Sequence, residues 1–470
     1  MNADKLDPEQ QPAQTPAERV QSMRPVGGGQ FAAFAGSTTL ANTTALVLGV
    51  AASIIAARAL GPTGKGTLMF LRTVPNMVFA MGNLGIGSAI AYRIARGLTP
   101  APRMAGLALV SGVAFGLAGI LVALVFMGPP NKLWGQVSPW VVWVALAMLP
   151  LIFLENFLGR TLIAQLNVHH VSGALIVGAV VTCSSLAVVL LLLKADVPGA
   201  VLAYTGPKVL VVVLLLIMVW RQVGFSLHFD RTMLVATLGY GIIAHLLLFS
   251  NQMVYKVDIF FVKAWQGDAQ LGLYSVSAQL AQLFWLMPNA LSKVLRPVAS
   301  RDSEERSRHA LGLCRMQSAV NIVGGPILVA VAPLLIRLYG IRFQPAVWPF
   351  YALLPGVLML PIYKYLVTDL TARGKQRFAL LVSLSGLSVD VVLVALLVPR
   401  GAWYGGIVGA GIASTVAYSL MALAMASYYV RRRGVRYRDI FVPTRSDWLA
   451  VSSLAKTVLD RIRRRPSAQP

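Results

Sequence analysis

Two short stretches decide how this chain is organised: residues 57–66 read ARALGPTGKG, and residues 263–272 read KAWQGDAQLG. In each stretch two glycines stand five positions apart, and Gly61 corresponds to Gly267 at an offset of 206 residues. Each stretch also lies between two long apolar runs. The match therefore predicts a chain built from two halves with the same order of helices.

The composition indicates a membrane protein that is helical throughout. Of its 470 residues 57% are hydrophobic and 12% are charged, whereas a soluble domain carries about 25% charged residues. The net charge of +24 lies mostly in tails and short loops and comes with no nucleic-acid-binding signature, so nucleic acid is excluded as a partner. Cys183 and Cys314 fall in or beside apolar runs, which argues against a disulfide framework or a metal site.

Repeated apolar runs of about 20 residues predict roughly twelve transmembrane helices. Since the repeat offset equals six spans, we expect two six-helix lobes related as parallel repeats, with the site where the lobes meet. The predicted units are a disordered tail (1–30), an N-terminal lobe (31–222), a C-terminal lobe (232–430) and a basic tail (431–470). The expected spans lie near 33–57, 67–92, 104–127, 139–160, 171–193, 199–220, 238–263, 272–295, 312–336, 346–368, 378–399 and 404–430.

Basic residues set the expected orientation. They concentrate in both tails and in the even-numbered loops, for example at Arg93, Arg96 and Arg103. The positive-inside rule then places both termini in the cytoplasm. Beyond the last span, apolar residues at helical spacing, from Trp448 to Ile462, lie among arginines. This pattern predicts an amphipathic helix on anionic membrane lipids.

Basic residues lie inside or at the edge of several predicted spans, among them Arg72, Lys208, Lys256 and Lys293. A cation in hydrocarbon costs about 2.5–3.5 kcal/mol at the centre of a helix, so such residues usually face a protein-lined cavity. Arginine suits bidentate contact with phosphate, and lysine suits point-charge attraction. These four side chains are therefore the candidate anion-binding residues of a transporter.

Polar side chains on spans one, two, seven and eight could bind sugar hydroxyl groups, although such residues more often form hydrogen bonds between helices. They are Asn42, Asn76, Asn251, Gln252, Gln279 and Gln282. Three carboxylates in or near the spans are candidate sites for a coupling Na⁺ or proton, although carboxylates in spans more often pair structurally: Asp258, Glu155 and Asp390. No histidine or cysteine spacing fits a metal ion, and no glycine-rich lysine loop for ATP occurs, so no cofactor is expected.

Three segments of the chain carry recognisable motifs. They are ARALGP at 57–62 with Gly66; VDIF at 257–260 with LGLYS at 271–275; and LYG at 338–340 with Phe343 and Ala346. These segments resemble the polysaccharide-export flippases of the multidrug/oligosaccharidyl-lipid/polysaccharide (MOP) superfamily, and the likeness spreads over residues 33–430. The resemblance implies two lobes around a cavity that opens alternately to either face. It also implies a non-enzymatic flippase in the bacterial inner membrane.

The same resemblance implies the substrate and partners. The substrate is an oligosaccharide repeat unit on a polyprenyl diphosphate such as undecaprenyl diphosphate, moved from the cytoplasmic to the periplasmic leaflet for exopolysaccharide or O-antigen. Other polysaccharide-assembly proteins are possible partners. A drug or metabolite exporter of the same superfamily is the main alternative, and it favours cavity carboxylates for organic cations. A membrane glycosyltransferase or polymerase is a further alternative, which has only Asp196 and Asp268 as acidic residues in the predicted external loops.

Overall fold

The computed structural model describes residues 28–127, 134, 137–227, 242–285, 303–399, 405–449 and 451–453. Helices form nearly all of this part of the chain, and no strand occurs within it. The predicted all-α class is therefore confirmed. The helices of the N-terminal half are α2 (Gly28–Gly82), α3 (Ile86–Ala95), α4 (Ala101–Met127), α5 (Pro139–Leu146), α6 (Met148–Ala164), α7 (Val168–Ala187) with the π-helical turn η3 (Val188–Leu192), and α8 (Val197–Gln222).

The described helices of the C-terminal half include four long helices, α13 to α16, and end with the short helix α17. They are α10 (Ile242–Val254), α11 (Val257–Phe284), α13 (Ser303–Arg337), the 3-10 turn η4 (Ile341–Ala346), α14 (Val347–Ala372), α15 (Gln376–Leu397), α16 (Gly406–Arg433) and α17 (Arg438–Phe441).

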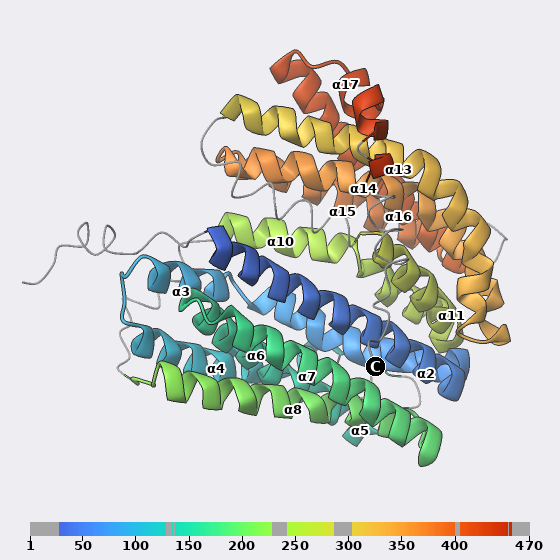
Figure 1. The fold of residues 1–470 in the computed structure, drawn as a ribbon. Helices are drawn as coiled ribbons and strands as arrows, with labels where there is room; N and C mark the ends of the chain where they lie inside the picture. The colour runs from blue at the N-terminus through green and yellow to red at the C-terminus, as the bar shows by residue number, and fades with distance from the viewer. Residues whose placement is uncertain are drawn as a thin grey trace, which may run out of the picture.

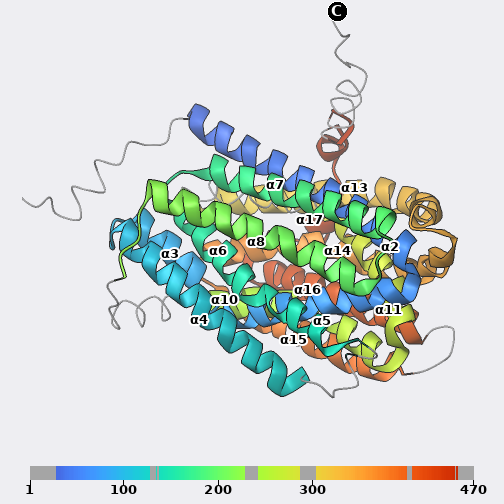
Figure 2. The ribbon, with the colours of Figure 1, turned by 90° about the horizontal axis from the view of Figure 1, so that it is seen from below.

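The two halves form two lobes that lie side by side (Figure 1). Helices α2–α8 make one lobe and α10–α17 the other, with α2, α10 and α11 along the boundary between them. Between the lobes α2 packs mainly against α11, and to a lesser extent against α10 and η4. In the view from below, α4, α6, α7 and α8 form the face of the N-terminal lobe that points toward the viewer (Figure 2).

The helices have the length and composition of membrane spans. Within the described ranges, nine helices are long and apolar enough to cross a membrane, and the first of these, Gly36–Gly82, covers most of the first two predicted spans. Large apolar side chains point outward from several of them, including Leu121 and Val125 of α4. In an aqueous protein such faces would be costly, but in a bilayer they contact lipid. The chain is a multi-pass membrane protein, and the count of twelve spans stays a prediction.

The two repeat stretches differ from the loops that the sequence predicts. Residues 58–66 are helical except at one position: two helical segments of α2 meet at Gly61, which has the non-helical angles φ 65° and ψ −175°. Its counterpart Gly267 bends α11 in the same way, with φ 77° and ψ −174°. A glycine in this left-handed region turns the chain within a single residue, because it has no Cβ to clash. The predicted loops are therefore sharp bends between helices.

The segment after α16 folds back onto the C-terminal lobe. Ile440 of α17 is fully buried, and α17 packs on α13. Arg315 of α13 donates from Nε to Asp447 Oδ2 at 3.1 Å and from Nη1 to the Asp439 carbonyl at 3.3 Å. Burial alone would raise the pKa of Asp447, but hydrogen bonds from Thr444 and Arg315 outweigh it and lower that pKa. Part of the predicted basic tail is thus a docked cap, and residues 454–470 lie outside the described residues.

Truncation after Tyr429 is expected to lower the abundance of the protein in membranes several-fold. It removes the buried Ile440 together with the Arg431–Arg433 cluster, and a loss of about 1–2 kcal/mol of stability is enough to change abundance by that factor. Quantitative immunoblots of membrane fractions measure the effect. Truncation after Ser453 keeps the docked cap and serves as the control. Equal abundance of all three chains would show that the cap contributes nothing.

Candidate functional site

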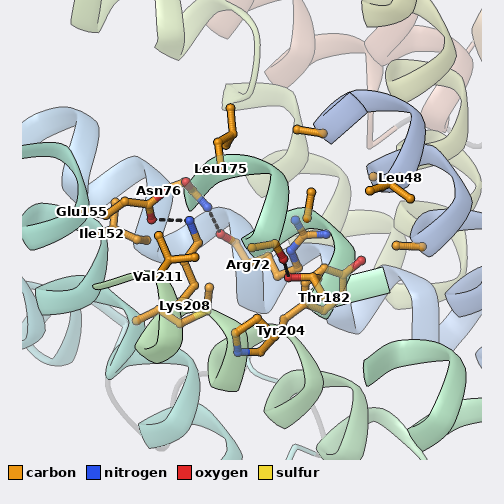
Figure 3. Close-up of a pocket in the computed structure, with 17 residues that line it drawn as sticks. Leu48, Arg72, Asn76, Ile152, Glu155, Leu175, Thr182, Tyr204, Lys208 and Val211 are labelled. Carbon is orange, nitrogen blue, oxygen red and sulfur yellow. Dashed lines mark hydrogen bonds and ion pairs between the residues drawn. The ribbon is translucent and has the colours of Figure 1, made fainter. Parts of the chain in front are cut away.

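A cavity of about 330 Å³ lies inside the N-terminal lobe, between α2, α6, α7 and α8. Four of the residues predicted from the sequence line it: Arg72, Asn76, Glu155 and Lys208 (Figure 3). The other lining residues are Ala45, Leu48, Gly49, Ala52, Met148, Ile152, Leu175, Gly178, Ala179, Thr182, Tyr204, Pro207 and Val211. The charged groups thus sit in a mostly apolar shell, as is usual for ligand pockets.

Two neighbours contact Arg72, one at its side chain and one at its backbone carbonyl. Its guanidinium carbon lies 3.8 Å from the centre of the Tyr204 ring, which gives a cation–π contact between α2 and α8. Asn76, one turn further along α2, donates from Nδ2 to the Arg72 carbonyl at 2.7 Å. The Tyr204 ring lies against the face of the guanidinium and does not cover the N–H groups, which lie in the guanidinium plane. Arg72 can therefore present a planar set of donors to an anion.

Lys208 and Glu155 form an ion pair across α8 and α6. Both side chains keep about a third to a quarter of their surface exposed, at 35% and 25%. A second cavity of about 380 Å³ shares Asn76, Ile152, Glu155, Lys208 and Val211 with the first, so the pair lies where the two cavities meet. The carboxylate reduces the charge that Lys208 offers to an anion, which makes Arg72 the stronger attractor in this cavity.

Lys256 belongs to the other lobe and lies at a break in the helices. It is the residue before α11, with φ −144° and ψ −7°, where α10 has already ended at Val254. It lies close enough to Arg72 for the two cations to repel each other, and Asp258 partly offsets this repulsion. Arg72 also lies near Lys65, which is 5% exposed. Arg72 is therefore within electrostatic reach of one lysine from each lobe.

The C-terminal lobe holds two buried carboxylates. Asp258 accepts a hydrogen bond from the Tyr274 hydroxyl and another from the Ile259 backbone N–H at 2.8 Å. Asp390 of α15 is fully buried, and neither of its oxygens has a hydrogen-bond partner among the described residues. It lies within electrostatic reach of Asp258, and the Ser414 hydroxyl faces both. Such a carboxylate must be protonated or must bind a cation, because an isolated buried charge is too costly.

The remaining polar candidates divide by environment. Asn42, Gln252 and Gln282 are exposed. Asn251 is already engaged, since Nδ2 donates to the Leu247 carbonyl at 2.8 Å and Oδ1 accepts from the hydroxyls of Tyr363 and Ser383. Gln279 accepts a hydrogen bond from Ser53 at 2.5 Å. Lys293 lies outside the described residues, so its predicted role stays a prediction.

The reasoning from sequence missed three buried or half-buried lysines: Lys65, Lys263, which forms an ion pair with Asp268, and Lys364. Lys65 falls in a stretch interpreted as a loop, yet it lies inside the bent helix α2. Lys364 lies in α14, with its ammonium 4.3 Å from the centre of the Trp285 ring and 5.3 Å from that of Tyr255. The signal for Lys364 was present, because a lysine inside an apolar span is the feature that identified the other cations. Among the described residues no group of histidine, cysteine and acidic side chains could hold a metal ion.

Comparison with known proteins agrees with this geometry. A sequence model of a family described as "Polysaccharide biosynthesis protein" matches residues 161–347, which confirms the predicted resemblance. Among proteins with curated functions, no sequence matches significantly.

Solved structures of transporters share the fold. An inward-facing multidrug resistance MATE family transporter of the MOP superfamily superposes with a TM-score of 0.67 at 16% identity, over 83% of this chain and 94% of that chain. Its outward-facing conformation gives a TM-score of 0.64 at 15% identity, over 86% and 95%. A MOP superfamily transporter from Pyrococcus furiosus, reported for the reverse polarity of its binding pocket, gives 0.63 at 15%, over 86% and 95%. Residues 161–347 therefore match the polysaccharide-biosynthesis family model, and the chain shares its fold with solved MOP-superfamily transporters.

Proposed function

We propose that this protein is a flippase that moves a polyprenyl-diphosphate-linked oligosaccharide from the cytoplasmic to the periplasmic leaflet by alternating access. The polysaccharide-biosynthesis match supports the substrate class, and the MOP fold supports the mode of transport. The proposal makes the chain a transporter and not an enzyme. It places the chain in the bacterial inner membrane with both termini in the cytoplasm, as the basic loops predict.

The electrostatic proximity of Arg72 to two lysines, one from each lobe, is the observation that carries the proposal. Arg72 lines the cavity and lies near both Lys65 of its own lobe and Lys256 of the other. A diphosphate carries roughly two negative charges and cannot cross hydrocarbon alone, whereas a cluster of cations in a water-poor site attracts it strongly. The prenyl chain needs no polar site, because it stays in the lipid while the head group moves between the lobes.

Export of organic cations is less well supported by the same cavity. Its lining includes two basic residues, Arg72 and Lys208, and one carboxylate, Glu155, which is already paired with Lys208. A pocket for a cationic drug needs carboxylates that are free to pair with the ligand. The Pyrococcus transporter named above is precedent, within this fold, for a pocket whose polarity differs from that of drug exporters.

Asp258 and Asp390 are the proposed coupling site, and Glu155 is a weaker candidate because it is paired with Lys208. Two buried carboxylates with a shared serine hydroxyl can take up either Na⁺ or a proton. Uptake of one cation on one side of the membrane and its release on the other would return the empty carrier to its starting conformation. The proposed lipid partner of the C-terminal tail is an anionic inner leaflet, and polysaccharide-assembly proteins are the proposed protein partners.

Ligand-induced stabilisation of the purified protein tests the substrate class. Undecaprenyl diphosphate should raise the melting temperature in detergent, whereas undecaprenol, which lacks the phosphates, should not. The Arg72→Gln variant should lose most of the shift, because a charge-assisted hydrogen bond contributes about 1.5–3 kcal/mol. Stabilisation by ethidium, an organic cation, together with no response to the diphosphate would contradict the proposal and favour drug export.

A further inference from the structure

The lobes touch at a crossing of two backbones, formed by Pro62 and Gly66 of α2 and by Asp268 and Gly272 of α11; we call it the glycine crossing. A Cβ on Gly66 would lie 1.8 Å from the Asp268 carbonyl oxygen, and a Cβ on Gly272 would lie 1.9 Å from the Pro62 carbonyl oxygen. No side chain fits at either position. Each lobe thus presses a glycine against the backbone of the other, in a nearly symmetric pair of contacts.

The bends at Gly61 and Gly267 produce this symmetry. The two glycines have nearly the same φ and ψ, and in each lobe the close-packed glycine follows the bend by five positions. The sequence repeat therefore ends in a physical contact between its two copies. The charge distribution predicts that this end of the lobes faces away from the cytoplasm.

A buried hydrogen-bond chain joins the same two lobes. Lys65, next to Gly66, donates from Nζ to the Ser53 hydroxyl at 2.6 Å, and this hydroxyl donates to Gln279 Oε1 at 2.5 Å. Lys65 and Ser53 belong to α2 and Gln279 to α11, so the chain crosses the boundary. Among the described residues no carboxylate forms an ion pair with Lys65, which is 5% exposed.

A third contact crosses the boundary at this end. Arg58 of α2 donates from Nε to the Leu338 carbonyl, which follows α13, at 2.8 Å. The three segments that resemble the MOP flippases, around Arg58, Gly272 and Leu338, therefore all contribute to this one region. Polar contacts of this kind exchange readily with water, which lowers the cost of parting the lobes at this end.

We propose that Lys65 is the latch of a closure formed by the glycine crossing, and that an anion in the cavity opens it. The Lys65 ammonium donates to the Ser53 hydroxyl and so orients that hydroxyl to donate to Gln279. The Ser53–Gln279 hydrogen bond then holds the two lobes together. An anion bound at Arg72, which lies near Lys65, attracts the ammonium away from Ser53 and weakens the bond between the lobes. The latch itself needs no assumption about the substrate; its response to an anion rests on the proposed function.

Distance measurements between spin labels test the latch without any transport assay. Thr63 and Ala269 are exposed on the two sides of the crossing, and cysteines at these positions can be labelled once Cys183 and Cys314 are replaced by alanine. Without ligand, the wild-type background should show a short distance. Lys65→Met should shift the ratio of long to short distances by about tenfold or more, the effect of losing one hydrogen bond to a charged group. Gly66→Ala and Gly272→Ala should shift the ratio in the same direction, because the added Cβ overlaps a backbone carbonyl oxygen of the other lobe. Gly36→Ala, on the same helix with open space around it, is the control.

Inorganic pyrophosphate is the probe for the second half of the proposal. It should lengthen the distance in the wild-type background and should have no effect in Arg72→Gln. Unchanged distances in Gly66→Ala, Gly272→Ala and Lys65→Met would overturn the latch. Because the three variants perturb different atoms, the test survives if one of them misfolds. A working latch with no response to pyrophosphate would overturn the anion-triggered step alone. A latch that responds to pyrophosphate in a protein that flips no lipid-linked sugar would support this inference and count against the proposed function.

Discussion

Replacing Arg72 by glutamine is expected to reduce polysaccharide export at least about tenfold while leaving the amount of protein in the membrane near normal. The guanidinium lines the cavity, and the loss of one charge-assisted contact with a phosphate costs about 1.5–3 kcal/mol, which corresponds to about 10–150-fold in binding. Folding should not suffer, because Arg72 forms no salt bridge with any described residue. Complementation of a deletion strain, with an immunoblot for abundance, measures both effects.

Two controls separate the role of Arg72 from a general loss of positive charge. Arg337→Gln removes an exposed arginine at the end of α13 and should leave export unchanged. Tyr204→Phe keeps the ring that packs on the guanidinium and should retain export, whereas Tyr204→Leu removes the cation–π contact and should lower it. Full export by Arg72→Gln would remove this residue from the proposed site.

Replacing Asp390 by asparagine is expected to abolish the dependence of transport on an ion gradient. The side chain is fully buried with no described hydrogen-bond partner, and asparagine can neither bind a proton nor neutralise Na⁺. In reconstituted vesicles the wild-type protein should respond to an imposed Na⁺ gradient or proton gradient, and the response identifies the ion. Asp258→Asn should behave alike, because the two carboxylates interact. Asp196→Asn, an exposed carboxylate before α8, is the control. An unchanged ion response in Asp390→Asn would place the coupling site elsewhere.

The sequence was sufficient to predict the helical class, the two lobes and the equivalence of the two glycine stretches as copies of one repeat. Those features depend on apolar run lengths and on a repeat, and both are visible along the chain. The sequence placed Lys65 in a loop because the apolar run ended near residue 57 and a Gly-Pro pair followed. The structure shows that one residue, Gly61, makes the whole bend, so the chain resumes its helix and carries Lys65 into the interior.

The composition of the site depended on contacts between distant parts of the chain. Arg72 and Asn76 stand four residues apart on one helix, so their proximity follows from helical spacing. Glu155 and Lys208 are 53 positions apart, and their pairing requires α6 and α8 to pack at a particular height. The packing of Lys364 against Trp285, or the approach of Lys256 to Arg72, likewise depends on how helices are placed in space. Periodicity does not determine that placement.

The energy source follows from the proposed charge of the substrate. Moving roughly two negative charges out of a negative cytoplasm is favourable by about 2.3 kcal/mol per charge per 100 mV, if the protein's own charges do not move with them. The membrane potential can thus drive net outward flipping without ATP. The ion site at Asp258 and Asp390 would then reset the empty carrier.

Flipping of a fluorescent undecaprenyl-diphosphate-linked oligosaccharide in reconstituted vesicles tests the central claim most directly. A membrane-impermeant quencher reports the leaflet that the fluorophore occupies, and a potassium-diffusion potential of either sign can be imposed. The account predicts flipping that needs the protein, is lost in Arg72→Gln, speeds up when the cytoplasmic side is negative and slows when the potential is reversed. Flipping that requires ATP and ignores both the potential and any Na⁺ or proton gradient, or no flipping of this lipid at all, would contradict it.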